Sequence, residues 1–301
     1  MHNRVSSRHP EWTILKVLHW ATTYFKRNDI DSPRATAEIL LAHALAAERI
    51  DLYLHYDQPL NAEELSRFKA VIKRRIKREP VAYILGYKEF WSLQLAVTQK
   101  VLIPRPETEC LVERALACLA ATSGSGRQRI LEMGTGCGAI LIALASENAG
   151  HTYWGTDISV AAIQVAQRNA LDHDLAASIH FLVADWFAPF AVRAGLFDMV
   201  ISNPPYIRSG DLKRLQPEIQ EFEPLVALDG SEDGLHCLRH IIQSAHVYLK
   251  PGGILLLEMG HDQKAPLKQI IQCCDPYEDV AFYTDYSGYD RIVAMRKRAI
   301  K

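Results

Sequence analysis

Strand-like and helix-like segments alternate from residue 129 to residue 273, and this order constrains the fold more than any other feature of the chain. Short runs rich in branched and aromatic residues predict strands at 129–133, 152–156, 180–184, 197–202 and 253–259. Amphipathic or apolar stretches between them predict helices at 139–147, 160–171, 235–249 and 265–273. Two last segments, 280–284 and 291–295, predict an antiparallel strand pair. Because strands that alternate with helices form a parallel sheet with helices on both faces, we expect an α/β fold with a mostly parallel seven-stranded sheet.

The residues before position 85 have a different, helical pattern. Apolar residues recur at helical spacing in 11–27, Ser32-Pro33 has the form of an N-cap followed by proline, and Asn61 is placed to cap a third helix. Loose apolar alternation over 87–103 predicts a β-hairpin. We therefore expect a small helical N-terminal domain at 1–85, a hairpin and linker at 86–106, and the α/β domain at 107–301.

Charge and composition limit the partners that the chain can have. Lys and Arg number 34 and Asp and Glu number 35, whereas a protein that grips a long stretch of nucleic acid usually carries a basic excess. The first residues lack the apolar region of an export signal, and the longest apolar runs are too short to span a bilayer. The cysteines show no metal-ligand spacing, which is typical of free thiols in a reducing compartment. We expect a cytoplasmic monomer without membrane contact or bound metal.

A glycine-rich loop follows the first predicted strand and is the candidate cofactor site. In Gly134-Thr135-Gly136-Cys137-Gly138, glycines permit a tight turn and let a ligand approach the backbone. Ligands of open α/β sheets bind at this end of the strands. Asp157, 19 residues after Gly138, ends the second strand and can accept hydrogen bonds from ribose hydroxyls. NAD and S-adenosylmethionine both carry such a ribose, so the loop alone leaves both cofactors open.

Trp186, after the third strand, is the candidate contact for the base of the cofactor. Its ring offers a flat face or an apolar edge to an adenine, with Asp185 as a polar partner beside it. A tryptophan at this place can equally serve to close the edge of the sheet. The sequence leaves both interpretations open.

The fourth strand runs directly into Asn203-Pro204-Pro205-Tyr206, the segment that most sharply defines the chemistry. An amide nitrogen is a poor nucleophile because its lone pair is delocalised, and its two N–H groups need two acceptors in fixed positions. The Asn203 side-chain oxygen and the Pro204 carbonyl can supply them, while the prolines stiffen the turn. Tyr206 can pack its ring against the planar group. We predict that this segment holds an amide or amine nitrogen for methylation, with Asn203, Pro204 and Tyr206 catalytic and Pro205 a further substrate contact.

These motifs resemble those of the HemK-type protein-(glutamine-N5) methyltransferases, which modify class I peptide-chain release factors. The resemblance extends over nearly the whole chain and includes the helical N-terminal region and the three motifs above. It also includes three further segments, 101–109, 227–234 and 288–291. Cys137 stands where a small or hydroxyl residue is expected, and Ser231 where a second glycine is common. Neither departure removes a needed hydrogen-bond acceptor.

The resemblance implies a class I, Rossmann-like methyltransferase fold with S-adenosylmethionine as the cofactor. It implies that the loop from Gly134 to Gly138, Asp157, Trp186 and Asn203 contact S-adenosylmethionine, while Asn203 to Tyr206 hold the substrate. That substrate would be the glutamine of the Gly-Gly-Gln loop of a release factor, methylated at its side-chain N5.

A run of basic residues on the predicted third helix has two interpretations. Its members are Lys69, Lys73, Arg74, Arg75, Lys77 and Arg78. A solvated charged face near the C-terminus of a helix accounts for the run without any partner. Alternatively, Lys69 to Arg78 form a docking face for the protein substrate or for nearby RNA.

Three other functions stay open on the sequence. A related enzyme could methylate glutamine in a ribosomal protein, although the linker 103–109 looks closer to the release-factor branch. A DNA adenine-N6 methyltransferase makes the same demand on Asn203 to Tyr206, but the balanced charge and the lack of an evident base-recognition domain disfavour it. A non-catalytic nucleotide-binding regulator or an NAD enzyme would leave Asn203 to Tyr206 unexplained.

Overall fold

The computed structural model describes residues 12–121, 126–190 and 195–299, which divide into one compact unit up to Leu85 and a second from Gly86 onward. The segment in which no export signal is expected, 1–11, lies outside the described residues. Within the described ranges, none of the helices has the length and apolar character needed to cross a bilayer.

The first unit is helical, as predicted, and packs around its own apolar core. Its helices are α1 Ile14–Arg27, α2 Pro33–Leu45, α3 Asp51–Leu54, α4 Ala62–Ile76 and α5 Val81–Leu85. The predicted third helix is α4, because the short helices α3 and α5 carry no periodic signal. Asn61 caps α4 as predicted, in a reciprocal capping box with Glu64. Ser32 occupies the N-cap position of α2 and Pro33 begins the helix, as predicted, but the Ser32 φ of +47° is left-handed rather than extended and its side chain makes no capping bond.

The second unit begins with the predicted hairpin. Its strands are β1 Tyr87–Phe90 and β2 Leu93–Ala96, so the hairpin is shorter than the alternating pattern, and 97–103 is irregular chain. The buried Asn169 ties β2 to the body of the unit, because its side chain accepts from the backbone N–H of Ala96 and donates to the carbonyls of Ala96 and Cys137. The hairpin is thereby connected to the glycine loop.

The second unit contains a seven-stranded sheet in the order β5-β4-β3-β6-β7-β9-β8, which confirms the predicted fold class. The strands are β3 Arg129–Met133, β4 Thr152–Asp157, β5 Ile179–Val183, β6 Phe197–Ser202, β7 Leu249–Glu258, β8 Tyr277–Thr284 and β9 Asp290–Lys297. The first five in this order are parallel, and β9 is antiparallel to both β7 and β8. Since β4 and β5 lie on one side of β3, and β6 and β7 on the other, strand order reverses between β3 and β6.

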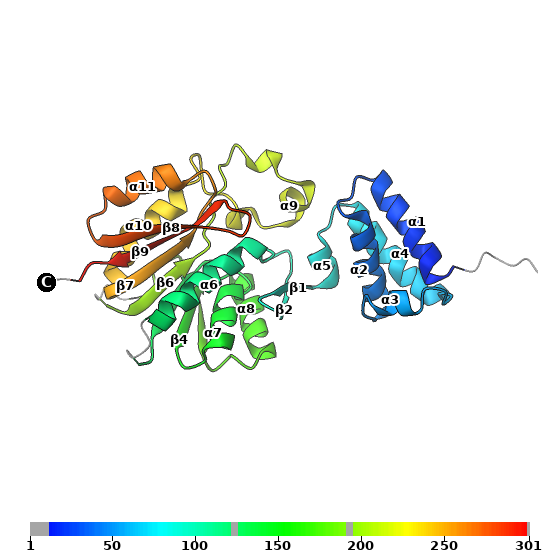
Figure 1. Ribbon diagram of the computed structural model, residues 1–301, viewed down its shortest axis with the longest axis horizontal. Helices are drawn as coiled ribbons and strands as arrows, with labels where there is room; N and C mark the ends of the chain where they lie inside the picture. The colour runs from blue at the N-terminus through cyan, green and yellow to red at the C-terminus, as the bar shows by residue number, and fades with distance from the viewer. Residues whose placement is uncertain (1–11, 122–125, 191–194, 300–301) are drawn as a thin grey trace, which may run out of the picture. The chain divides into compact units, whose positions relative to one another are not determined.

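Helices cover both faces of this sheet (Figure 1). Their bounds are α6 Pro106–Ala121, α7 Ala139–Glu147, α8 Val160–Asp172, α9 Pro217–Phe222, α10 His236–Tyr248 and α11 Lys264–Gln272. Helices α6, α7 and α8 pack on one face, and α10 and α11 on the other. The buried side chains of α7 fit its position between the sheet and two neighbouring helices. Helix α9 lies in the long connection between β6 and α10, and the sequence predicts no regular structure at 203–234.

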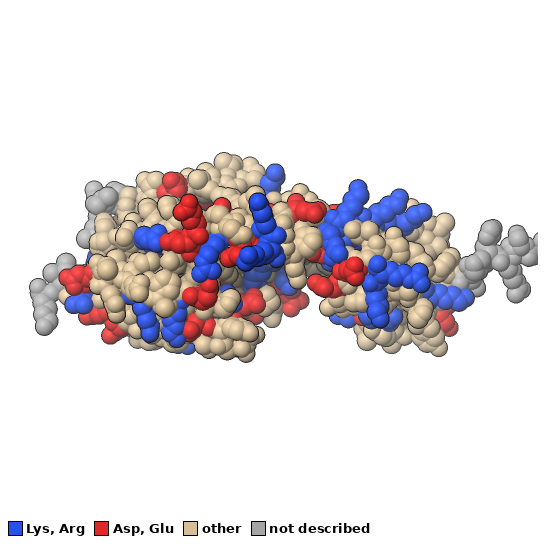
Figure 2. Space-filling view, turned by 90° about the horizontal axis from the view of Figure 1, so that it is seen from above, with Lys and Arg blue, Asp and Glu red and all other residues tan. Residues whose placement is uncertain are grey.

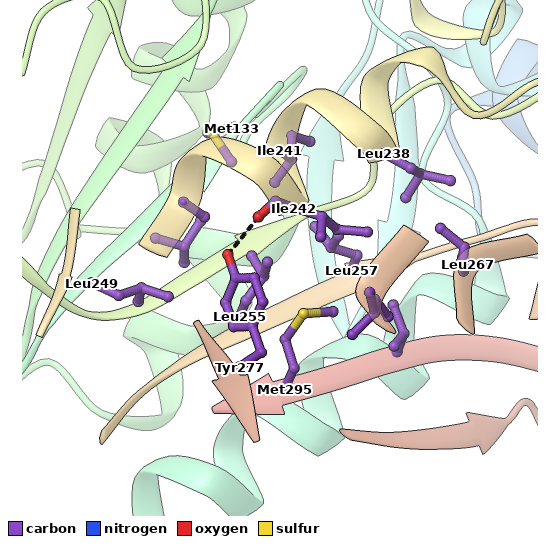
Figure 3. Close-up of a cluster of buried hydrophobic side chains, with 14 of the residues drawn as sticks. Met133, Leu238, Ile241, Ile242, Leu249, Leu255, Leu257, Leu267, Tyr277 and Met295 are labelled. Atoms are coloured by element: carbon purple, nitrogen blue, oxygen red, sulfur yellow. Dashed lines mark hydrogen bonds between the residues drawn. The ribbon is translucent and has the colours of Figure 1, made fainter. Parts of the chain in front are cut away.

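The core beneath α10 contains one buried polar link (Figure 3). Apolar side chains from β7, β9 and α10 surround Tyr277 at the start of β8. The Tyr277 hydroxyl donates to the backbone carbonyl of Ile242 at 2.7 Å. This bond joins the antiparallel edge of the sheet to α10.

Tyr277→Phe should lower the free energy of unfolding by about 1 kcal/mol, because it leaves the buried Ile242 carbonyl with one bond fewer. Urea titration monitored by circular dichroism measures this loss. Tyr283→Phe on the same strand is the matched control, since the Tyr283 ring packs against Arg114 and its hydroxyl makes no hydrogen bond within the described residues. Equal stability of the two variants would contradict a role for the Tyr277 hydroxyl.

Candidate active site

Strand register places the two principal motifs side by side. Met133 at the end of β3 pairs with Thr156 of β4 and with Ser202 of β6, so the carboxyl ends of these three strands are level. The Ser202 hydroxyl also donates to the Met133 carbonyl at 2.7 Å. The glycine loop and the segment from Asn203 therefore leave the sheet next to each other, where strand order reverses. Open α/β sheets bind their ligands at this point.

A cavity of about 460 Å³ opens at this edge. Of the predicted site residues, it is lined by Gly134, Gly136, Asp157, Trp186, Asn203 and Pro205. The structure thus brings together residues from four separate loops, after β3, β4, β5 and β6. Thr135, Cys137, Gly138, Pro204 and Tyr206 do not line it.

The glycine loop has the conformation that its composition predicts. Gly134 and Gly136 have φ values of +68° and +55°, and a Cβ at either position would meet no protein atom within 4 Å. Their backbone therefore borders open space in the cavity. Asp157 fixes the loop, because its Oδ2 accepts from the Gly136 N–H and its Oδ1 from the Ser159 N–H, both at 2.9 Å. A carboxylate has further lone pairs with which to accept from a ligand.

The other loop residues face inward. The Thr135 hydroxyl donates to the buried carboxyl of Glu132 at 2.6 Å. Cys137 is buried, and burial raises the pKa of its thiol to about 12, which keeps the sulfur protonated. Gly138 begins α7 at a φ of +85°, where a Cβ would approach Ala166 Cβ to 3.2 Å. These residues shape the loop, and the cofactor contacts predicted for them stay predictions.

Trp186 has a strained backbone beside the cavity. Its φ is +46°, in the left-handed region that bulky residues rarely adopt. The side chain is partly buried against the core, and its ring centroid lies 5.8 Å from that of His240. Asp185 lines the cavity beside it, as the interpretation of this pair as a base-binding site requires.

Asn203 is held by a chain of side-chain hydrogen bonds. Its Nδ2 donates to Thr108 Oγ1 at 3.1 Å, and the Thr108 hydroxyl donates to Glu258 Oε2 at 2.8 Å. The Tyr206 hydroxyl donates to the other oxygen of Glu258 at 3.1 Å. Burial raises the pKa of Glu258 to about 7, although Thr108, Arg291 and Tyr206 each lower it. Thr108 lies in the segment 101–109 that shares the family resemblance, but the sequence assigns it no role, and no motif points to Glu258, because each acts through a partner far away in the sequence.

Tyr206 faces the protein interior. Burial raises the pKa of its hydroxyl, and its backbone carbonyl accepts from Gln263 Nε2 at 2.9 Å. Two glycines pack against its backbone: an added Cβ would lie 2.8 Å from Tyr206 Cα at Gly230, and 2.6 Å from Tyr206 O at Gly234. The segment 229–234 therefore supports the turn from behind. The predicted contact between the Tyr206 ring and a substrate stays a prediction.

Two segments that were not among the predicted site residues complete the wall of the cavity. Lys100 to Leu102 form one part and Pro224 to Ala227 another, with Leu225 and Val226 exposed at the rim. Glu223 joins the two, because its carboxylate pairs with Arg105 at 2.6 Å and accepts from the Ile103 N–H at 3.2 Å. Isolated charged residues such as Glu223 and Arg105 leave no periodic pattern in the sequence, so their pairing could not be predicted before the fold was known.

In the part of the chain that the structure describes, no cluster of three or more His, Cys, Asp or Glu side chains could hold a metal ion. The cysteines of this part are free thiols, as expected.

Comparison with known proteins places the chain in a family. The PrmC N-terminal domain family matches residues 16–86, and a methyltransferase domain family matches residues 125–291. A release factor glutamine methyltransferase of Geobacter sulfurreducens is 40% identical over 95% of this chain and 97% of its own length. That of Chlorobaculum tepidum is 37% identical over 93% and 96%, and that of Burkholderia pseudomallei 42% over 85% and 89%.

The chain belongs to the release factor glutamine methyltransferase family. The predicted resemblance is confirmed, and the protein is a methyltransferase that uses S-adenosylmethionine. Among solved structures, the hMettl16 catalytic domain in complex with the MAT2A 3'UTR hairpin 6 aligns with a TM-score of 0.56. At 15% identity, over 77% of this chain and 82% of that one, this likeness shows the fold alone.

The cavity fits S-adenosylmethionine. Its volume lies within the range of small-molecule pockets, about 300–1,000 Å³. Gly134 and Gly136 let a ligand approach their backbone, Asp157 offers a carboxylate to ribose hydroxyls, and Ile158 with Leu225 offers apolar surface. The methyl donor would thus lie beside Asn203.

Glu132→Gln should flatten the pH dependence of stability. Burial raises the pKa of Glu132 from 4.5 to about 8, so its carboxyl is neutral in the folded protein at pH values where the unfolded chain is ionised. Its contribution to stability is full below pH 4.5 and is lost as the pH rises through about 8. Urea titrations of cofactor-free protein between about pH 5 and about pH 9 should show a smaller fall in unfolding free energy than in wild type.

The matched control for this experiment is Glu278→Gln, at an exposed position on β8. Its pH dependence should equal that of wild type. If Glu132→Gln also behaved like wild type, the carboxyl would not be neutral in the folded protein.

Proposed function

We propose that the protein transfers a methyl group from S-adenosylmethionine to the side-chain N5 of the glutamine in the Gly-Gly-Gln motif of class I peptide-chain release factors. The observation that carries the proposal is the position of Asn203, an amide at the end of β6 beside the glycine loop. The near full-length similarity to proteins named release factor glutamine methyltransferases supports the choice of substrate.

The chain's own residues would act mainly by position. S-adenosylmethionine supplies an electrophilic methyl group on a sulfonium. Asn203 Oδ1 and the Pro204 carbonyl accept the two N–H groups of the glutamine and align its nitrogen, an arrangement that can contribute about 7–11 kcal/mol. As the N–C bond forms and the C–S bond breaks, the nitrogen becomes positively charged, so its surplus proton leaves to solvent without a strong base.

The test is incubation with labelled S-adenosylmethionine and, separately, a class I release factor, ribosomal proteins and DNA, followed by mapping of the label. Label on the Gly-Gly-Gln glutamine is the expected result. Label on a ribosomal protein glutamine or on DNA adenine would select one of the alternative substrates and overturn the proposal.

Asn203→Ala should lower kcat by about 100-fold or more, because it removes a preorganised acceptor of the reacting group. The dissociation constant for S-adenosylmethionine, measured by calorimetry, should change much less, since the glycine loop and Asp157 remain. Unchanged turnover would refute the role of Asn203.

We propose further that residues 1–85 dock the substrate, with 86–106 as a hairpin and linker and 107–301 as the catalytic domain. Figure 2 shows Lys and Arg gathered over the helical unit, whereas charges of both signs intermix over the other unit. Half of the basic run is used internally: Arg74 pairs with Glu79, Arg75 is buried, and Arg78 donates to carbonyls of the α1–α2 turn. Lys69, Lys73 and Lys77 are exposed, as is the paired Arg74, and the spacing of the three lysines places them on one face of the helix.

Replacing Lys69, Lys73 and Lys77 together by Glu should raise KM for a whole release factor by roughly 10-fold, because a docking face would then repel its partner. KM for a short Gly-Gly-Gln peptide, which lacks the rest of the release factor, is the internal control and should not change. An unchanged KM for the whole factor would leave the lysines as a solvated face and exclude docking or RNA contact through them.

We propose, finally, that the enzyme is a monomer in the cytoplasm, where translation takes place.

A further inference from the structure

The proposed chemistry depends on which end of the Asn203 amide faces the cavity. The oxygen and nitrogen ends of a carboxamide have nearly the same shape, so a half-turn exchanges an acceptor for a donor. A substrate nitrogen with two N–H groups needs the oxygen. A flipped amide would present N–H to N–H and bind the group poorly. The site therefore needs a device that selects one orientation.

Thr108 provides the selection through the direction of its single hydroxyl proton. Above the pKa of Glu258 the carboxylate is ionised and can only accept, so that proton is donated to Glu258 Oε2 at 2.8 Å. Thr108 Oγ1 can then act only as an acceptor toward Asn203. The Asn203 amide must therefore donate from its Nδ2, which lies 3.1 Å from Thr108 Oγ1. Within the described residues this is the one side-chain hydrogen bond of Asn203, so Oδ1 is left for a ligand.

We infer that Thr108 and Glu258 are positioning residues that fix the Asn203 amide with its oxygen toward the substrate nitrogen. The inference rests on the proposed function. Thr108 comes from the first turn of α6 and Glu258 from the end of β7, so two elements outside the tetrapeptide set its polarity. Both side chains are almost fully buried, with exposures of 4% and 1%.

Glu258 holds both ends of the segment Asn203–Tyr206. Its Oε2 acts on Asn203 through Thr108, and its Oε1 accepts directly from the Tyr206 hydroxyl at 3.1 Å. Both donors are neutral, and the nearby Arg291 is bonded to Asp285 instead. A carboxylate buried so deeply, with no ion-pair partner among the residues that the structure describes, is costly for stability. The role of Glu258 in orienting Asn203, through Thr108, and Tyr206 accounts for its buried position.

The test compares Thr108→Val with Thr108→Ser, at a pH above the pKa of Glu258. Valine has the shape of threonine without the hydroxyl, so both the constraint on Asn203 and the donor to Glu258 are lost. We expect kcat for release-factor methylation to fall by about 10- to 100-fold. The dissociation constant for S-adenosylmethionine should stay within about 2-fold of wild type, since no cofactor contact is removed. Serine restores the hydroxyl and should recover most of the turnover.

Two further variants separate positioning from stability. Tyr277→Phe removes an equally buried hydroxyl bond between two residues that do not line the cavity, and it should lower stability without lowering kcat. Glu258→Gln keeps the volume of the side chain, but its single carbonyl oxygen replaces two acceptors, so kcat should fall here as well. This variant also serves if Thr108→Val does not fold.

The outcomes distinguish the inference from the proposed function. Wild-type protein that leaves the release factor unmethylated would overturn both. Methylation by wild type together with wild-type kcat in Thr108→Val, or in Glu258→Gln, would overturn the positioning role alone. A loss in Thr108→Val that serine does not recover, or an equal loss in Tyr277→Phe, would show that the hydroxyl is only structural.

Discussion

The alignment of β3 with β6 is the constraint on which the site depends. Parallel pairing places Met133 beside Ser202, and the Ser202 hydroxyl donates a hydrogen bond to the Met133 carbonyl, which holds the ends of the two strands together. Because each motif begins one residue later, the cofactor loop and the amide turn are placed by backbone geometry rather than by contact between their side chains. A slip of one residue in this register would turn each side chain to the opposite face of the sheet.

A buried glutamate and a threonine support each of the two motifs. Glu132 receives the hydroxyl of Thr135 inside the glycine loop, and Glu258 receives that of Thr108 beneath the amide turn. Both carboxyls have raised pKa values because burial disfavours their charge. The protein thus accepts a cost in stability at two points, and each is hydrogen-bonded to a threonine that belongs to or holds one of the two motifs. Costs of this kind are common where function requires a fixed geometry.

Local patterns were enough to predict the sheet, because a strand and the helix after it each carry their own periodicity. The bounds of β3, α7 and β6 agree with their predictions to the residue. The backbone motifs of the cavity were also predictable, since glycine and proline act on their own backbone. The partners of those motifs were not: Thr108, Glu223 and Glu258 act across more than a hundred residues of chain or through another side chain. The left-handed Ser32 and the inward-facing Tyr206 likewise depend on tertiary packing.

The ion pair between Arg105 and Glu223 shows that the chain before α6 is part of the cavity wall. Residues 87–124 lie between the two family matches and belong to neither, yet they supply Lys100 to Leu102 and Thr108. A fragment cut at the first residue of α6 would keep every strand of the large sheet, while one side of its ligand cavity would be gone. The smallest piece with the complete cavity is therefore longer than the smallest piece with the complete sheet.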